Sequence, residues 1–323
     1  MPSFIEVCSG CGGLSTGLID AGFTPLFLNE IDKTCVDTLK KNHSGVKIIQ
    51  KDMRELDIKN LDCPDLLCGG VPCQSFSQAG KRKGLEDPRG DLIIYFIKMV
   101  NQIKPKVFMI ENVPGLTTHN KGKTLETILD KLNTDNLYKI SFKILNANDY
   151  GVAQKRKRLF IIGVRKDIQK EFVFPKEKKY KPVLRDILED VPESEGCVYS
   201  EEKKKVFYLV PPGGCWIDLP ENIQKSYMKN SFFSGGGKRG IARRLSLDEP
   251  CLTLTTSPCQ KQTERIHPLE TRPFTVREYA RIQSFPDSYV FSGSKMNQYK
   301  QIGNAVPPKL AKAVGKSIIK LFE

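Results

Sequence analysis

The stretch of sequence that decides the fold is FIEVCSGCGGLSTGLIDA, residues 4–21. Its first five residues are typical of a buried strand, and its last eight have the spacing of a helix. Between them, Gly10, Gly12 and Gly13 form a loop whose backbone amides can approach a ligand closely. A strict dinucleotide fingerprint has a third glycine where this chain has Ser15. The loop alone therefore fits a nucleotide site and a tight turn without a ligand about equally well.

The alternation of strand and helix continues beyond this stretch. We predict strands at residues 25–29, 46–50, 65–68, 107–110, 142–145 and 159–164, and helices at residues 32–42, 91–104 and 310–321. Such alternation favours βαβ units and a parallel sheet that is covered on both faces. The predicted fold class is therefore α/β, with a doubly wound, Rossmann-like, mostly parallel sheet.

Residues 175–272 interrupt this rhythm with the run Gly235–Gly237, few helical patterns and several prolines, among them Pro182, Pro192, Pro211, Pro212, Pro220 and Pro250. Prolines and glycines break regular elements, so we predict a second, smaller domain that is irregular or β-rich. The boundaries we assign are residues 1–184 plus 274–323 for the first domain and residues 185–273 for the second.

Composition restricts the class of protein. The 323 residues include 51 Lys and Arg against 37 Asp and Glu, a net charge of +14 that suits a polyanionic partner. No apolar run approaches the roughly 20 residues that span a bilayer, and we see no secretory signal. We expect the ten cysteines to be reduced thiols. Cys8 and Cys11 have CxxC spacing, but Cys11 lies in the glycine loop and no partner pair has clean zinc-ligand spacing.

Polar residues follow the predicted strands at one edge of the sheet. Glu30 ends the second strand, 20 residues after Gly10, where an acid can bind ribose hydroxyls. Asp52 follows the third strand and can accept from an adenine amino group. Cys73 lies in a polar turn after the fourth strand, which suits a nucleophilic thiolate, although most cysteines are buried hydrophobes. Glu111, near the end of the fifth strand, is a candidate acid–base group or a structural acid.

Seven motifs occur in an order that resembles the DNA cytosine-5 methyltransferases over almost the whole chain. They are SGCGG (9–13), NEID (29–32), PCQSFS (72–77), ENV (111–113), QKRKR (154–158), REYARIQSFPD (277–287) and GNAVPP (303–308). The resemblance is weakest at residues 190–235, within the part that corresponds to the family's target-recognition domain. It implies the S-adenosylmethionine-dependent methyltransferase fold for the first domain.

The resemblance also implies S-adenosylmethionine as the cofactor. The glycine loop would line its methionine end, Glu30 its ribose, and Asp52 with Met53 its adenine. The full set of implied cofactor contacts is Cys8, Ser9, Gly10, Cys11, Gly12, Gly13, Asn29, Glu30, Ile31, Asp52, Met53, Gly70, Pro72, Leu92, Asn304, Ala305 and Val306. Cys8 and Ile31 stand where many relatives carry aromatic residues, so adenine would lose two ring contacts.

For catalysis, the resemblance implies that Cys73 attacks C6 of a cytosine flipped out of the duplex. Glu111 would hold and protonate N3, and Arg158 would bind the O2 side while Arg156 supports the loop. Both arginines are expected to touch the flipped nucleotide. The expected DNA contacts are Ser77, Lys81, Lys238, Arg239, Ile241, Arg243, Arg244, Thr253, Lys261 and Arg265. Among them, Arg243 and Arg244 would read bases, and Arg239 or Ile241 would fill the space that the cytosine leaves.

Two alternatives share the scaffold. A tRNA-methylating relative would carry a Cys-Phe-Thr signature, which we do not find, and an inactive DNA-binding regulator would have lost Cys73, Glu111 or the glycine loop. The expected partner is duplex DNA, with no membrane and no metal. We further expect a monomeric, cytoplasmic and nucleoid-associated enzyme, with a cognate restriction endonuclease as a candidate partner.

Overall fold

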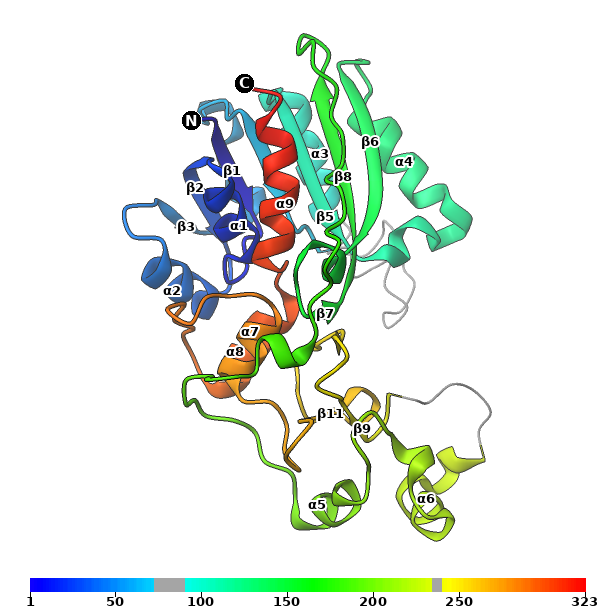
Figure 1. The fold of residues 1–323 in the computed structure, drawn as a ribbon. Helices are drawn as coiled ribbons and strands as arrows, with labels where there is room; N and C mark the ends of the chain where they lie inside the picture. The colour runs from blue at the N-terminus through cyan, green and yellow to red at the C-terminus, as the bar shows by residue number, and fades with distance from the viewer. Residues whose placement is uncertain (73–90, 234–239) are drawn as a thin grey trace. The chain divides into compact units, whose positions relative to one another are not determined.

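The computed structural model describes residues 1–72, 91–233 and 240–323, and the chain divides into two compact units (Figure 1). The first unit contains residues 1–151, 157–179 and 305–323, and the second contains residues 152–156 and 180–304. Among the described residues, no helix combines the length and apolar character needed to cross a membrane.

A seven-stranded sheet forms the centre of the first unit, in the order β3-β2-β1-β4-β5-β8-β6. Its strands are β1 (Ser3–Val7), β2 (Thr24–Glu30), β3 (Ile48–Gln50), β4 (Leu66–Gly69), β5 (Val107–Asn112), β6 (Tyr138–Asn146) and β8 (Lys157–Arg165). Strands β1 to β5 pair in parallel, and β8 runs antiparallel to both β5 and β6. The predicted mostly parallel α/β sheet is confirmed.

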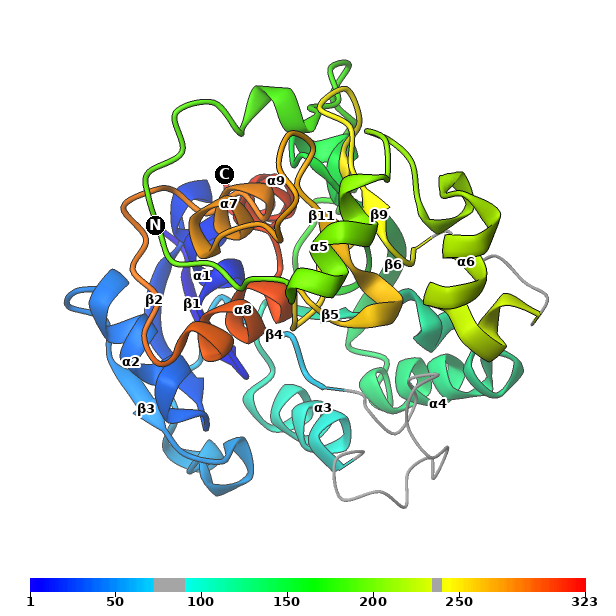
Figure 2. The ribbon, with the colours of Figure 1, turned by 90° about the horizontal axis from the view of Figure 1, so that it is seen from below.

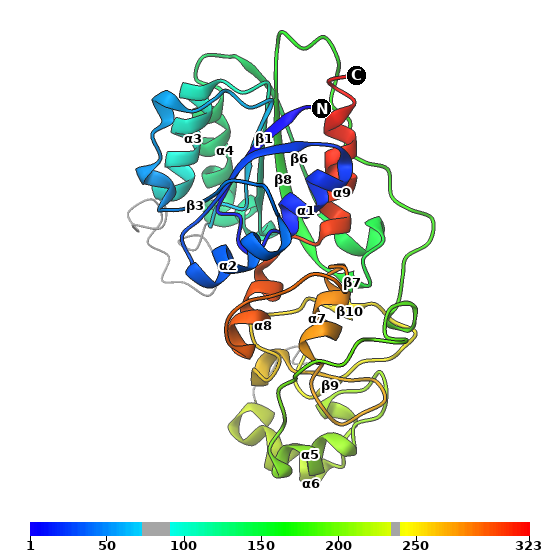
Figure 3. The same ribbon diagram turned by 90° about the vertical axis from the view of Figure 1, so that its left-hand side faces the viewer.

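Helices cover both faces of this sheet. They are α1 (Gly13–Ala21), α2 (Lys33–Asn42), α3 (Asp91–Ile103), α4 (Lys123–Leu132) and α9 (Pro308–Ile319). Figures 2 and 3 show α3 and α4 on one side of the sheet and α1 and α9 on the other. Alternate strand residues such as Ile5 and Val7 share one buried apolar cluster with α3 and α4, as the period of two along a strand requires.

Helices α1 and α9 pack closely because glycines stand where they meet. A Cβ atom at Gly17 would lie 2.4 Å from the Cβ of Ala311 and 2.4 Å from the carbonyl oxygen of Pro308. A Cβ atom at Gly315 would lie 2.8 Å from that of Ala21. Since α1 begins directly after the glycine loop, this packing also fixes the position of the loop.

The second unit contains short elements joined by irregular chain. Its helices are α5 (Glu201–Tyr208), α6 (Glu221–Met228), α7 (Val276–Ile282) and α8 (Lys295–Asn304), and its strands are β7 (Gln154–Lys155), β9 (Arg243–Arg244), β10 (Cys251–Leu252) and β11 (Arg265–Ile266). Strand β10 pairs with β7, and β11 pairs with β9. The irregular character is as predicted, but the β-rich alternative is wrong because no strand of the described part of this unit exceeds two residues.

The unit boundaries differ from the predicted domain boundaries. Helices α7 and α8 cluster with the second unit, whereas the sequence assignment places residues 274–323 in the catalytic domain. The two compact units are defined by contacts between residues and not by function. The assignment of residues 185–273 to a separate target-recognition domain therefore stays a prediction.

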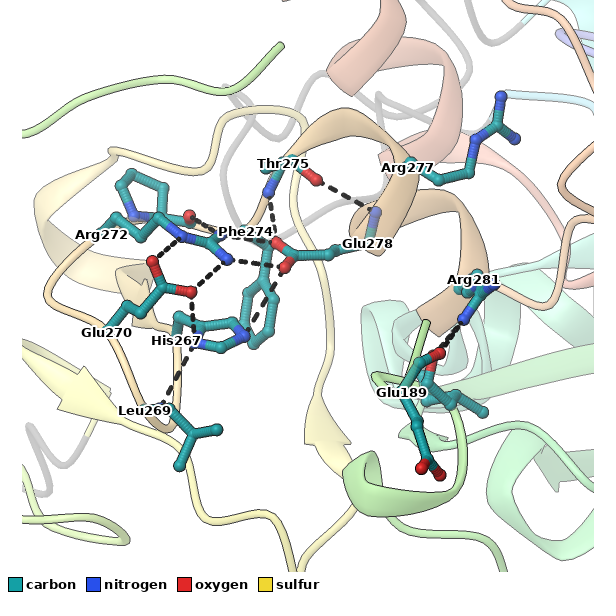
Figure 4. Close-up of polar contacts among 12 residues, drawn as sticks. Glu189, His267, Leu269, Glu270, Arg272, Phe274, Thr275, Arg277, Glu278 and Arg281 are labelled. Atoms are coloured by element: carbon teal, nitrogen blue, oxygen red, sulfur yellow. Dashed lines mark hydrogen bonds and ion pairs between the residues drawn. The ribbon is translucent and has the colours of Figure 1, made fainter. Parts of the chain in front are cut away.

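Side chains of the motif REYARIQSFPD make hydrogen bonds and ion pairs within the second unit (Figure 4). Glu278 forms a capping box with Thr275 at the start of α7 and accepts two bonds from Arg272, at 2.7 and 2.8 Å. His267 Nε2 lies 3.5 Å from the same carboxylate. Arg281 donates to the carbonyl oxygen of Glu189 at 2.6 Å. The first contacts join α7 to the chain directly before it, and the bond to Glu189 joins it to a segment 92 residues away in the sequence.

Candidate active site

The sheet brings most of the predicted site residues of the first unit to one edge. Strands β1, β2, β4 and β5 are parallel, so their carboxyl ends, with the glycine loop, Glu30, Gly70 and Glu111, lie at the same edge. Strand β8 runs antiparallel to β5, with Asn112 paired to Leu159, and its first residues therefore lie there too. This is the edge at which doubly wound sheets bind ligands.

The glycine loop has a backbone that other residues adopt at a cost. Gly10 and Gly12 have φ angles of 55° and 85°, in the left-handed region. A Cβ atom at Gly10 would meet no heavy atom within 4 Å, so the space beside this backbone is open. Gly10 is half-buried and Gly12 and Gly13 are buried, so the open space lies beside Gly10 alone, and the role of the loop in holding the cofactor stays a prediction.

Glu30 links this loop to the end of β2. Its Oε2 accepts from the amide of Gly10 at 2.7 Å, and its Oε1 accepts from the amides of Ile31 and Asp32 at 2.8 and 2.9 Å. A carboxylate has about four acceptor positions, so three amide bonds leave one on Oε2. This remaining position fits a ribose hydroxyl beside the glycine loop.

Residues predicted to hold adenine have mixed surroundings. Cys8 Sγ lies 3.6 Å from Met53 Sδ, and Ile31 is 62% exposed. Asp52 caps the short helix η1 (Met53–Glu55), and the side chain of Arg54 donates to its two oxygens at 3.0 and 2.6 Å. The hydrogen bonds from Arg54 hold the pKa of Asp52 below its usual value.

Several predicted cofactor contacts serve the scaffold through their side chains. The Asn29 carboxamide donates to the carbonyl oxygens of Ile49 and Lys51, at 3.1 and 2.9 Å, and so joins β2 to β3. The side chain of Cys11 is buried in the core. Most of the other predicted cofactor contacts belong to the first unit: Ser9, Gly13, Gly70, Pro72, Leu92, Ala305 and Val306. Asn304 belongs to the second unit, where it is exposed at the end of α8.

Glu111 and Arg158 form a largely buried ion pair at this edge. Arg158 Nε lies 2.9 Å from Glu111 Oε1, and Arg158 Nη1 donates to the carbonyl oxygen of Lys157. Burial lowers the pKa of the Arg158 guanidinium, and the Glu111 carboxylate opposes that shift. Gly70 leaves room for the carboxylate, because a Cβ atom there would lie 3.2 Å from Glu111 Oε2. The ion pair places Glu111 and Arg158 side by side, and their predicted roles at N3 and at the O2 side of the base stay predictions.

Asn112 connects this pair to the loop after β4. Its carboxamide donates to the carbonyl oxygen of Val71 at 3.1 Å and accepts from the amide of Val113 at 2.8 Å. The loop beyond Pro72 leads to Cys73. Cys73 lies outside the described residues, as do the predicted DNA contacts Ser77, Lys81, Lys238 and Arg239.

Sequence reasoning missed one buried acid in this region. Glu6, in the middle of β1, is 1% exposed, and among the described atoms its Oε2 has no hydrogen-bond partner. Burial raises the pKa of this carboxyl well above its usual value, while hydrogen bonds from Ser15 oppose the shift. The nearby charges of Glu30 and Glu111 raise it further. The signal in the sequence was a single acidic residue within an apolar strand.

Arg156 belongs to the second unit and is 1% exposed. Its guanidinium donates to the carbonyl oxygens of Leu254 and Gly303, at 3.2 and 2.7 Å. These bonds agree with the expected supporting role. They correct the expectation that Arg156 touches the flipped nucleotide, because its side chain is enclosed by protein.

Arg244 is also a structural residue, which corrects the expectation that it reads bases. Its five N–H groups donate to five oxygens of the second unit: the carbonyls of Val210, Phe207, His267 and Glu270 and the hydroxyl of Thr271. A guanidinium has five N–H donors, so none remains for a base. Its side chain therefore joins, through hydrogen bonds, segments of the second unit that are separate in the sequence.

The remaining predicted DNA contacts differ in exposure. Arg243 is held by Glu249, with two bonds of 2.9 Å, and by the carbonyl oxygen of Gly213. Ile241 is buried in the core of the second unit, which corrects its expected role as the residue that replaces the cytosine. Arg265 is buried too, whereas Thr253 and Lys261 are exposed.

Comparisons with known proteins agree with the motifs and the fold. The pattern of the C-5 cytosine-specific DNA methylases matches residues 2–320. The chain is 54% identical to Type II methyltransferase M.Sau96I of Staphylococcus aureus, over 97% of this chain and 75% of that protein. It is 48% identical to Type II methyltransferase M.Eco47II of Escherichia coli, over 99% of this chain and 79% of that protein.

Solved structures show the same fold. A prophage-encoded protein of E. coli, assigned as a DNA modification methyltransferase, has a TM-score of 0.74 at 26% identity, covering 100% of this chain and 99% of that one. A methyltransferase of Entamoeba histolytica has a TM-score of 0.75 at 17% identity, covering 100% and 99% of the two chains. Within the described part, no group of three His, Cys, Asp or Glu residues suits a metal ion.

Proposed function

The chain belongs to the C-5 cytosine-specific DNA methylase family, and on that premise we propose how its own residues carry out the reaction. It is a DNA cytosine-5 methyltransferase that uses S-adenosylmethionine. The observation that carries the proposed mechanism is the Glu111–Arg158 ion pair, which lies at the same sheet edge as the glycine loop.

The described residues fit the cofactor that the family uses. The open backbone at Gly10 suits the methionine end, and the remaining acceptor position of Glu30 suits the ribose. Exposed Ile31 and the Cys8–Met53 contact leave adenine with aliphatic and sulfur surfaces. S-adenosylmethionine supplies the methyl group when it is bound.

Cytosine C5 is a poor nucleophile, so the protein must first activate the ring. The Cys73 thiolate forms a bond to C6, which converts the ring to an enamine that is nucleophilic at C5. Glu111, held by Arg158, donates a proton to N3 and so draws electrons from the ring during attack. Methylation of C5 leaves S-adenosylhomocysteine as the second product. Loss of the C5 proton to a base, return of the N3 proton to Glu111 and release of the Cys73 thiolate then restore the aromatic ring as 5-methylcytosine.

Arg158 also orients the carboxyl group of Glu111. Its Nη1 is fixed by the carbonyl oxygen of Lys157, so Nε stays directed at Glu111 Oε1. The other N–H groups of this guanidinium are then available to the O2 side of the base. Since the ring must leave the helix stack to reach this pair, the mechanism requires base flipping, at a cost of about a few kcal/mol.

The mechanism is tested by trapping on duplex DNA that contains 5-fluorocytosine. Fluorine at C5 blocks the last elimination, so the wild type should form a covalent adduct through Cys73, and Cys73→Ala should form none. Glu111→Gln should slow methyl transfer by about 10²–10⁴-fold. Glu126→Gln, an exposed acid on α4, is the matched control and should keep its rate. An adduct with Cys73→Ala would contradict the mechanism.

The finer points of the assignment are part of the same proposal. Residues 185–273 form the target-recognition domain, with exposed Thr253 and Lys261 among its DNA contacts. The enzyme acts as a monomer in the cytoplasm, where it associates with the nucleoid through DNA. The Type II names of its relatives support a restriction–modification system with a cognate endonuclease.

A further inference from the structure

Glu6 is a buried acid that the proposed mechanism does not use. It is the fourth of the five residues of β1, and only 1% of it is exposed. Among the described atoms, its Oε2 has no hydrogen-bond partner. A carboxylate that lacks both partners and water is costly, so such a group keeps its proton. Burial accordingly raises the pKa of Glu6 well above its usual value. Glu6 is therefore a neutral acid in this structure.

The glycine loop is joined to Glu6 and lies on the same side of the sheet as its side chain. Ser9 Oγ donates to the carbonyl oxygen of Glu6 at 3.2 Å. Ile5 and Val7 share a cluster with α3 and α4, and side chains alternate along a strand. Glu6 therefore faces the side that α1 and α9 cover (Figures 2 and 3). Since α1 begins at Gly13, the start of this helix is on that side too.

The register of the sheet brings two further acids to the same face. Glu6 pairs with Leu28 of β2, two residues before Glu30. It also pairs with Cys68 of β4, whose own partner on β5 lies two residues before Glu111. With strands about 4.8 Å apart and a rise of about 3.3 Å per residue, the Cα atoms of Glu30 and Glu111 lie about 8 and 12 Å from that of Glu6. Three acids thus gather where the sheet meets the glycine loop.

Glu30 and Glu111 have partners that offset their charge, unlike Oε2 of Glu6. Arg158 pairs with Glu111 at 2.9 Å, and three backbone amides donate to Glu30. The charged side chains of α1 and α9 are exposed or half-exposed: Asp20, Lys309, Lys312, Lys316 and Lys320. The thiols next to Glu6 on β4 and in the loop, Cys68 and Cys11, are buried. A cation bound at the loop would therefore favour the ionised form of Glu6.

We propose that Glu6 is a charge-sensing residue by which the protein distinguishes S-adenosylmethionine from S-adenosylhomocysteine, an inference that rests on the proposed cofactor site at the glycine loop. S-adenosylmethionine carries a positive sulfonium, whereas the sulfur of S-adenosylhomocysteine is neutral. Glu6 releases its proton to solvent when the sulfonium binds and takes a proton back from solvent once the methyl group has left. The carboxylate form strengthens binding of the substrate alone, so the product leaves more easily.

Calorimetric titration in two buffers of different ionisation enthalpy counts the protons released on binding. Full-length wild type and Glu6→Gln are titrated with each of the two ligands at the same neutral pH. With S-adenosylmethionine, we expect the wild type to release up to about one proton more than Glu6→Gln. We also expect Glu6→Gln to bind this ligand about tenfold more weakly, the size of one charge–charge interaction within a protein. With S-adenosylhomocysteine, both the proton count and the affinity should be equal in the two proteins.

A control variant and a second measurement complete the test. Glu126→Gln, on the exposed side of α4, should release as many protons as the wild type. If Glu6→Gln melts early, infrared difference spectra of the wild type replace it. The carbonyl band of a protonated carboxyl group should disappear with S-adenosylmethionine and persist with S-adenosylhomocysteine.

Three results would overturn the proposal. The first is an equal proton release by wild type and Glu6→Gln with S-adenosylmethionine. The second is an equal loss of affinity for both ligands in Glu6→Gln, which a merely structural role would produce. The third is a carboxyl band that persists with S-adenosylmethionine. Failure of the cofactor site itself would show separately, as no binding of either ligand by the wild type, and would overturn both proposals.

Discussion

Replacing Gly17 by alanine tests whether the packing of α1 on α9 fixes the cofactor loop. The new Cβ atom would lie 2.4 Å from Ala311 Cβ and from the Pro308 carbonyl oxygen, and 2.7 Å from the Lys312 nitrogen. Ordinary contacts begin at 3.4 Å, so the helices are about 1 Å too close for a side chain. Two of the three neighbours are backbone atoms, which cannot rotate away.

The size of the effect follows from two opposing contributions. Alanine gains about 1 kcal/mol over glycine in helix propensity. Overpacking of a well-packed contact costs about 1–3 kcal/mol, and rigid backbone neighbours favour the upper end. We therefore expect a net loss of about 1–2 kcal/mol, or roughly 2–8 °C in the unfolding midpoint. Displacement of α1 should also weaken S-adenosylmethionine binding about fivefold, or roughly 1 kcal/mol.

Thermal unfolding and calorimetric titration with the cofactor measure both effects. Gly115→Ala is the matched control, since a Cβ atom there meets nothing within 4 Å, and its stability should stay within about 0.5 kcal/mol of the wild type. A Gly17→Ala variant that is as stable as the wild type and binds the cofactor equally well would refute the argument.

Three further predictions concern other residues. Arg244→Lys should lower the free energy of unfolding by about 3 kcal/mol or more, because it leaves buried carbonyl oxygens unpaired at about 1–3 kcal/mol each. Competition between cognate and mismatched duplexes should show the same binding preference as the wild type, and a weaker preference would restore the base-reading role. Burial lowers the pKa of His43 to about 4, below the roughly 6.5 of a histidine in an unfolded chain. The free energy of unfolding should therefore fall by about 3 kcal/mol as the pH drops from 6.5 toward 4. Urea unfolding of His43→Leu should lack this decline, and an equal decline in the variant would exclude His43 as its source. Ile31→Tyr should tighten S-adenosylmethionine binding by about 0.5–1.5 kcal/mol, since the exposed Ile31 leaves room for a ring to stack; calorimetry showing weaker binding would place the adenine elsewhere.

The fold of the first unit could be predicted closely because its elements differ in period. The strand predicted at residues 107–110 runs from Val107 to Asn112, and the helix predicted at 32–42 runs from Lys33 to Asn42. Parallel pairing then places the strand ends at one edge without further information. The pairing of Glu111 with Arg158 follows from the same topology once β8 is known to run antiparallel to β5.

The second unit could not be predicted in the same way. Arg244 and Ile241 stand in a basic, glycine-rich segment, and local sequence does not distinguish an arginine that binds DNA from one that binds five protein oxygens. That difference depends on which distant carbonyl groups the chain brings together. Glu6 is the opposite case, since a charged residue in an apolar strand is a local signal that we did not use.

The most direct test of the central claim is the identity of the methylated base. Wild-type protein is incubated with duplex DNA and methyl-labelled S-adenosylmethionine, with tRNA in a parallel reaction, and the products are digested to nucleosides. We predict label in 5-methyl-2′-deoxycytidine from duplex DNA alone, and none when Cys73→Ala replaces the wild type. Label in an amino-methylated adenine or cytosine, or in tRNA and not in DNA, would contradict the account.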